Sequence, residues 1–130
     1  MGDPVLDIML DELRLSMVKK NYVSFSKEAI RSKKSNIDYL KALLTVEQTH
    51  RVECRISRLI SAAKFPVIKT LSEFDFTQIP SLNKPLVLEL ANGHFIESKT
   101  NICLLGQTGT GKTHIATAIA YEACKKNHSV

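Results

Sequence analysis

Residues 106–113, with the sequence GQTGTGKT, restrict the possible fold of this chain more than any other segment. The glycines at 106, 109 and 111 allow backbone N–H groups to turn toward one point without clashes from side chains. The apolar run at 101–105 before the segment is typical of a parallel strand buried on both faces, with Cys103 as a small buried apolar residue. Small apolar residues at helical spacing follow it. We therefore expect a strand, a loop and a helix, as at the start of an α/β domain.

The residue types of this loop suit a chain of phosphate groups. Backbone N–H groups and the positive end of the following helix would bind phosphate oxygens. Lys112 supplies a mobile cation for the β- and γ-phosphates, and the Thr113 hydroxyl is a hard oxygen ligand for Mg²⁺. A glycine-rich turn that binds nothing is the alternative. The pattern, a Walker A motif, does not distinguish ATP from GTP, and the expected nucleotide-binding residues are Gly106, Gln107, Thr108, Gly109, Thr110, Gly111, Lys112, Thr113 and His114.

The first half of the chain has strong helix signals. Asp3 and Pro4 predict a helix start, and apolar residues then recur at helical spacing at Leu6, Met9, Leu10, Leu13 and Met17. The stretch NYVSFS interrupts this pattern, so we expect a separate short helix over residues 27–31, capped by Ser24 or Ser26.

A longer helix is expected over residues 36–64. Ser35 and Asp38 form a capping-box pattern at its start, and Pro66 ends it. Within it, Glu47 and Arg51 are spaced for a surface ion pair. The region after Pro66 has no clean period and predicts an irregular linker, followed by a helix over about residues 86–95. Phe74 and Phe76 either flank a nucleotide base or anchor this linker to a small core.

The chain is moderately basic, with 18 Lys and Arg against 13 Asp and Glu and a net charge of +5. Arg51, Arg55 and Arg58 are spaced to share one face of the long helix, where they could bind the DNA backbone. A solvated helix face beside Glu47 and Glu53 is the alternative.

The cysteines Cys54, Cys103 and Cys124 match no zinc or disulfide spacing, and the four histidines show no metal spacing. No apolar run approaches the roughly 20 residues that span a bilayer. We expect free thiols, no membrane association and a cytoplasmic location.

Several stretches together resemble the IstB-like ATP-binding proteins, which are helper ATPases of insertion-sequence transposition. They are LDELRLSMV, HRVECRISRLISAAKFPVIKTLSEFDF, LELANGHFIESKTNICLLG and the loop with its GKTH ending. This family belongs to the AAA+ superfamily and is related to the DnaC-type helicase loaders. The resemblance implies a helical N-terminal region before the α/β P-loop domain. It also implies ATP with Mg²⁺, binding to double-stranded DNA, a homo-oligomer and a transposase of the same element as partner.

An AAA+ ATPase also needs an acidic pair on a later strand, sensor residues and an arginine finger, and none can be placed in these residues. We therefore expect an N-terminal part of a longer protein that binds nucleotide without hydrolysing it alone. The expected parts are a helical region over 1–66, a linker and lead-in helix over 67–100, and the incomplete ATPase start over 101–130. Two alternatives stay open: a DnaC-like helicase loader, and a DNA-binding or interaction module with a vestigial nucleotide site.

Overall fold

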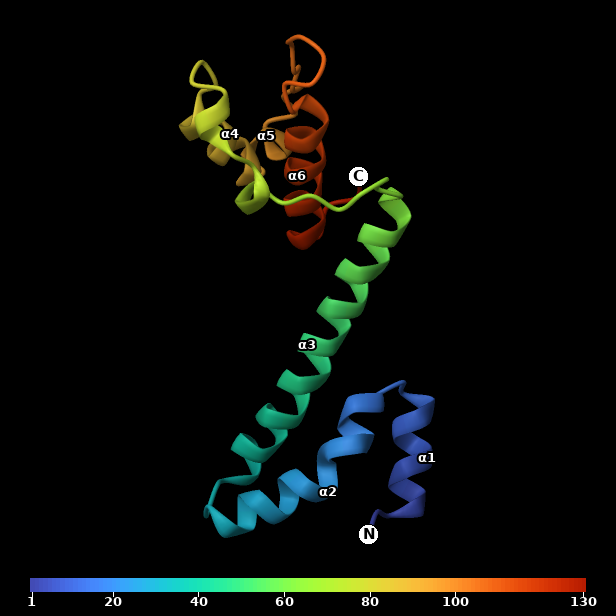
Figure 1. Cartoon of the computed structure of the whole chain (residues 1–130). Helices are drawn as coiled ribbons and strands as arrows, with labels where there is room; N and C mark the ends of the chain where they lie inside the picture. The colour runs from blue at the N-terminus through green and yellow to red at the C-terminus, as the bar shows by residue number, and fades with distance from the viewer. The chain divides into compact units, whose positions relative to one another are not determined.

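The computed structural model describes the whole chain, Met1–Val130, and contains six α-helices and two 3₁₀ turns (Figure 1). Contacts within the chain divide it into two compact units, Met1–Cys54 and Arg55–Val130, and each is described by itself. The expected division into 1–66, 67–100 and 101–130 stays a prediction. No strand is formed, so the α/β part of the expected fold is not seen here. None of the helices combines the length and the apolar character that a membrane crossing requires.

The first unit begins with α1 (Pro4–Glu12) and α2 (Ser16–Arg31), which lie side by side (Figure 1). Asp3 caps α1 as expected, because its carboxylate accepts hydrogen bonds from the N–H groups of Val5 and Leu6 at 2.9 and 3.2 Å. The expected break at NYVSFS is wrong. The chain breaks earlier, after Glu12, and α2 then runs unbroken through the region where a short separate helix over 27–31 was predicted.

The end of α1 is a left-handed cap without glycine. Arg14 has φ 55°, and the N–H of Leu15 donates to the carbonyl of Leu10 at 2.8 Å. The same six-residue hydrogen bond recurs after three other helices, with Lys33, Lys99 and Asn127 in the left-handed conformation. Of the left-handed residues that directly follow the helices, only Gly93, after α4, is a glycine. Without glycine as a signal, the sequence pattern did not mark the end of α1.

The beginning of α2 is capped by a residue from another helix. Its N-cap residue, Leu15, offers no side-chain hydrogen bond. Instead the carboxylate of Glu47, on α3, accepts from the N–H groups of Met17 and Val18 at 2.8 and 3.2 Å. Glu47 therefore does for α2 what an Asp or Ser at the N-cap does for other helices.

The helix α3 (Asn36–Ala63) begins where Ser35 and Asp38 predicted. The N–H of Asp38 donates to the Ser35 hydroxyl oxygen at 3.1 Å, and the hydroxyl donates to the Asp38 carboxylate at 2.7 Å. Its last residue lies directly before Lys64, which has φ 51°. The predicted helix over 36–64 is confirmed to within one residue.

The core of the first unit joins all three of these helices. It consists of Leu10, Val18 and Leu43, with half-buried neighbours Leu15, Tyr22, Phe25 and Tyr39 packed against it. The Tyr22 hydroxyl also accepts from the Asp3 N–H at 2.6 Å and donates to Asp7 at 3.0 Å, so it fixes the start of α1.

The second unit begins within the last part of α3. Two 3₁₀ turns, η1 (Leu71–Glu73) and η2 (Phe76–Gln78), come after that helix, and α4 (Lys84–Ala91) and α5 (His94–Glu97) follow them. The single helix predicted over 86–95 is therefore wrong. Gly93 has φ 83° and ends α4, and a second short helix starts after it. Asn83 caps α4 by accepting from the N–H of Leu86 at 3.1 Å.

The helix α6 (Lys112–Lys125) carries the core of the second unit. Its residues Ile115 and Ile119 are buried with Val87 of α4, and half-buried linker side chains pack around them, including Phe74, Phe76 and Leu82. The expectation that Phe74 and Phe76 anchor the linker to a small core is confirmed. Asn127, with φ 73°, ends α6.

The segment at 101–105 forms neither a helix nor a strand. Ile102 and Leu104 are half-buried against the α6 core, whereas Cys103 is exposed and Leu105 is 89% exposed. The expectation of a strand buried on both faces, with Cys103 inside, is therefore wrong for this chain. The cause is that the core packs on one side of the segment only.

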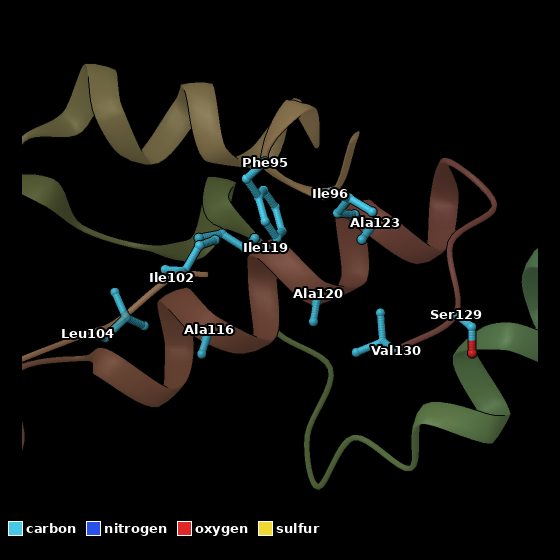
Figure 2. Close-up of a pocket in the computed structure, with 10 residues that line it drawn as sticks. All are labelled: Phe95, Ile96, Ile102, Leu104, Ala116, Ile119, Ala120, Ala123, Ser129 and Val130. Atoms are coloured by element: carbon cyan, nitrogen blue, oxygen red, sulfur yellow. The ribbon is translucent and has the colours of Figure 1, made fainter. Parts of the chain in front are cut away.

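An apolar groove runs along the remaining open side of α6 and has a volume of about 420 Å³ (Figure 2). Small side chains of α6 form one wall, and Figure 2 shows Val130 facing Ala120 from the end of the chain. The lining contains one hydroxyl, from Ser129, and is otherwise apolar. This groove shares no lining residue with the cavity at residues 106–113 that is described below. The two are therefore separate features of the second unit.

Candidate phosphate-binding site

The loop at 106–111 joins the segment at 101–105 to α6, and two of its glycines adopt a conformation that other residues rarely adopt. Gly109 and Gly111 both have φ 81°, in the left-handed region. Gly111 is the N-cap of α6, so the first N–H groups of a 14-residue helix lie at the end of the loop. Of the predicted strand, loop and helix, the loop and the helix are present, whereas residues 101–105 form no strand.

The side chain of Lys112 lies over the loop. Its Nζ donates to the carbonyl oxygens of Gly106 and Gln107 at 2.8 and 2.5 Å. The Thr110 hydroxyl donates to the same Gln107 carbonyl at 2.7 Å. A Cβ on Gly106 would lie 3.1 Å from the Thr110 hydroxyl oxygen, closer than ordinary packing allows. The Lys112 ammonium group is thus held against the backbone of the loop by two carbonyl oxygens.

An open cavity of about 570 Å³ lies at this loop. It combines the helix N-terminus with two lysines, one histidine and two threonines, and it contains no carboxylate; its lining is Lys69, Thr108, Gly109, Gly111, Lys112, Thr113 and His114. A helix N-terminus beside cationic side chains favours an anion. The arrangement is suited to binding phosphate groups.

His114 connects the loop to the linker. Its Nε2 lies 2.9 Å from the carbonyl oxygen of Thr70, and because a carbonyl only accepts, Nε2 must carry the hydrogen. The ring also meets Phe74 edge to face, with 5.2 Å between ring centroids and an interplanar angle of 89°. The linker is thereby attached to the first turn of α6.

Thr70 is held from its other side by Glu73, the last residue of η1. The Glu73 carboxylate accepts from the Thr70 N–H at 2.8 Å and from the Thr70 hydroxyl at 3.0 Å. The backbone hydrogen bond from Thr70, followed by the one from its hydroxyl, lowers the pKa of Glu73. This capping box fixes the backbone that precedes Phe74.

Phe74 and Phe76 have different surroundings. Phe74 lies against Gly111 and lines a second cavity, of about 260 Å³, together with Asp75, Gln78 and His114. Phe76 meets Phe74 edge to face at 4.9 Å and packs in the α6 core, with Lys84 Nζ 5.1 Å from its ring centroid. Of the two, only Phe74 lines this cavity beside the loop.

The Arg51 guanidinium, one of the three candidate DNA-binding groups, is engaged within the protein. Its Nε donates to Glu47 at 3.2 Å and its terminal nitrogen donates to the carbonyl of Arg14 at 3.0 Å. The predicted Glu47–Arg51 ion pair is confirmed, but it is no surface pair, because Glu47 is only 4% exposed. Arg55 and Arg58 are exposed on α3. DNA binding by these three residues stays a prediction.

Thr113 offers a hydroxyl oxygen, a ligand of the kind that Mg²⁺ prefers, at the loop. The Thr113 side chain is exposed in the 570 Å³ cavity. No group of three or more His, Cys, Asp or Glu side chains is arranged to hold a metal ion.

Sequence reasoning missed the roles of Lys69, Thr70 and Glu47 in these arrangements. The Thr70–Glu73 contact had a local signal, because Thr-x-x-Glu is a capping-box pattern. The contacts of Glu47 with α2 and of His114 with Thr70 join residues that are 29 to 44 positions apart in the sequence. A local sequence pattern therefore cannot predict them.

Comparison with known proteins adds a family and several relatives. Residues 8–130 match the profile of a family described as IstB-like ATP binding protein. The chain is 31% identical over 125 residues, 96% of its length, to a Pseudomonas aeruginosa protein named as an ATP-binding protein of insertion sequence IS21, and covers 47% of that protein. It is 33% identical over 120 residues, 92% of its length, to a Bacillus thuringiensis protein named in the same way for IS232, and covers 48% of it. A Geobacillus stearothermophilus protein named for IS5376 is 34% identical over 89% of the chain, which covers 46% of that relative. The chain thus spans about half the length of these curated relatives.

Proposed function

Because this chain belongs to the IstB-like ATP-binding protein family, we propose that it is an ATP-binding helper protein of DNA transposition. The observation that supports this most is the loop itself, with two left-handed glycines and the Lys112 ammonium group at the N-terminus of α6. The relatives are named for ATP binding and for insertion sequences, which supports ATP as the nucleotide.

In this proposal the loop residues from Gly106 to Gly111 direct their N–H groups toward the phosphates. Lys112 would exchange its carbonyl acceptors for phosphate oxygens, and the Thr113 hydroxyl would be a ligand for Mg²⁺, which would neutralise phosphate charge. The fit to phosphate is supported by the lining of the 570 Å³ cavity, which combines the N-terminus of α6 with Lys69 and Lys112 and contains no carboxylate. His114 closes the site toward the linker.

We further propose that these residues form the beginning of an AAA+ α/β domain, with the segment at 101–105 as one strand of its sheet. The alternation of half-buried Ile102 and Leu104 with exposed Cys103 and Leu105 supports a strand conformation. In the whole protein, the partners would be double-stranded DNA, a transposase of the same element and further copies of the chain.

The 130 residues alone are proposed to bind ATP without turning it over. The carboxylates that line the neighbouring cavity support this, because both are engaged locally. Glu73 accepts from Thr70, and Asp75 accepts from the Thr77 N–H at 3.0 Å and from its hydroxyl. A general base for water would have to come from elsewhere.

Equilibrium titration of the chain with ATP and Mg²⁺, together with a phosphate-release assay with and without duplex DNA, tests the proposal. We expect saturable binding that Lys112→Ala weakens at least about tenfold, since the lysine is a charged partner of the phosphates. No phosphate release is expected. Lack of ATP binding by the unsubstituted chain would refute nucleotide binding, and turnover that Lys112→Ala abolishes would refute the second part.

A further inference from the structure

The position of Lys69 relative to the phosphate-binding loop is not explained by the packing of the linker. Lys69 precedes the Thr70–Glu73 capping box, its side chain is exposed, and it forms none of the salt bridges of the chain. It nevertheless lines the 570 Å³ cavity together with Lys112 and Thr113. Two ammonium groups from distant parts of the sequence therefore lie at one anion-binding loop.

Lys69 is held at the cavity by contacts of the next residue. The Thr70 carbonyl accepts from His114 Nε2 at 2.9 Å, and the Thr70 N–H donates to Glu73 at 2.8 Å. His114 lies two residues after Lys112, in the first turn of α6. The backbone beside Lys69 is thus fastened directly to the helix whose N-terminus forms the site, while its side chain keeps its freedom to reach a ligand.

The charges around Lys69 leave it available to an anion. Glu73 is the carboxylate that interacts electrostatically with both Lys69 and His114. Its oxygens are engaged by Thr70, and it does not line the 570 Å³ cavity. An anion in that cavity would face the ammonium groups of Lys69 and Lys112 with no carboxylate among the lining residues.

We propose that Lys69 is a second phosphate-binding residue, which binds the polyphosphate of a nucleotide from the linker side while Lys112 binds it from the loop. This inference rests on the proposed nucleotide binding and adds a residue to it. His114 acts as a positioning residue, because its hydrogen bond to Thr70 places Lys69 at the cavity. The contribution of Lys69 should grow with the negative charge of the ligand, from AMP to ADP to ATP.

Calorimetric titration of the whole chain with ATP, ADP and AMP tests this proposal. We expect Lys69→Met to weaken ATP binding about five- to tenfold and AMP binding about twofold or less, since it removes one charged hydrogen-bond donor. Lys69→Arg should retain most of the affinity. Lys64→Met is the matched control, because Lys64 is an exposed lysine five residues upstream that lines none of these cavities, and it should leave every affinity unchanged. The difference between Lys69→Met and the unsubstituted chain should shrink at 0.5 M salt, where charges are screened over about 4 Å.

His114 variants test the positioning role separately. His114→Ala should weaken ATP binding. In the His114→Ala background, Lys69→Met should weaken ATP binding by less than it does in the unsubstituted chain, because Lys69 depends on the hydrogen bond between His114 and Thr70 for its position. His114→Gln keeps an N–H that can donate to the Thr70 carbonyl, so it should restore part of the affinity.

The outcomes separate this inference from the proposed function. If the unsubstituted chain binds ATP and Lys112→Ala abolishes binding, but Lys69→Met binds ATP, ADP and AMP as the unsubstituted chain does, then Lys69 is not a phosphate-binding residue. If Lys69→Met lowered the affinity for ATP, ADP and AMP by the same factor, the proposal for Lys69 would also be overturned, since a purely structural effect does not depend on the charge of the phosphates. If the unsubstituted chain binds no nucleotide, the proposed function fails first and this inference fails with it.

Discussion

The ring of Phe74 lies so close to Gly111 that a β-carbon at position 111 would be 2.6 Å from Cε2 of the ring. No real β-carbon tolerates such a contact, so the linker and the loop at 106–111 constrain each other's sequence. Gly109 has the same φ of 81°, but a β-carbon there would meet nothing within 4 Å. The two glycines thus share a backbone requirement and differ in packing.

This difference predicts unequal effects of alanine at the two positions. Gly109→Ala should lower the free energy of unfolding by about 1–2 kcal/mol, the cost of a left-handed conformation for an L-residue. Gly111→Ala should lower it by about 1–3 kcal/mol more, through the clash with Phe74. Urea denaturation of both variants gives the comparison. In a Phe74→Leu background the excess should largely disappear; an undiminished excess would mean that Phe74 is not its cause.

The buried carboxylate of Glu47 predicts a pH-dependent contribution to stability. Burial by itself raises the pKa of Glu47. The hydrogen bonds from the N–H groups of Val18 and Met17 and the Arg51 guanidinium lower this pKa by more, so its net shift is downward. A pKa lowered by folding means that the ionised form stabilises the protein above the unfolded pKa of about 4.5, and that this stability is lost as the pH falls through the folded pKa.

Glu47→Gln should therefore lower the free energy of unfolding by about 1–2 kcal/mol at pH 7, since hydrogen bonds to a charged group are replaced by weaker ones. At pH 3 and below, the gap between Glu47→Gln and the unsubstituted chain should narrow. Glu53→Gln, at an exposed position of the same helix, is the control and should have little effect. A gap that is the same at pH 7 and pH 2.5 would contradict the role assigned to the ionised carboxylate.

The arginines of α3 predict two separable effects. Arg55→Ala should weaken duplex DNA binding and reduce the slope of log affinity against log salt by about 1, as expected for the loss of one phosphate contact. Arg51→Ala should in addition lower the thermal stability, because its guanidinium binds Glu47 and the Arg14 carbonyl. Lys41→Ala, exposed on the same helix, serves as the reference. Salt slopes identical in Arg55→Ala and Lys41→Ala would count against an arginine-rich DNA-binding face.

The unpaired segment at 101–105 predicts a sharp boundary in amide hydrogen exchange. Its backbone N–H groups enter no ladder, so they should exchange at the earliest time measured. Amides in the middle of α6, such as those of Ala118 and Ala123, should exchange more slowly because they are helical and buried. Mass spectrometry of peptides after exchange resolves the two regions. Protection at 101–105 in a dilute, monomeric sample would show that these groups have partners within the chain.

Local signals in the sequence determined where several elements begin. Asp3 and Pro4 start α1, Ser35 and Asp38 start α3, and the loop glycines place the start of α6 at Lys112. Each signal works because the capping atoms lie within a few residues of the N–H groups that they satisfy, or because a left-handed φ favours glycine. The family was also predictable from the sequence, because the stretches that resemble it are spread over most of the chain. Phosphate binding by the loop at 106–113 stays a prediction, which rests on a contiguous pattern of residues.

Tertiary structure alone decided the rest. The start of α2 depends on Glu47, whose carboxylate accepts from an N–H 30 residues earlier in the chain. The same carboxylate also accepts from Arg51, which the sequence analysis predicted to bind DNA. Likewise, only the folded linker brings Thr70 to His114 and Lys69 to the loop. The physical reason is that a hydrogen bond depends on distance in space, and residue spacing predicts that distance only within a single regular element.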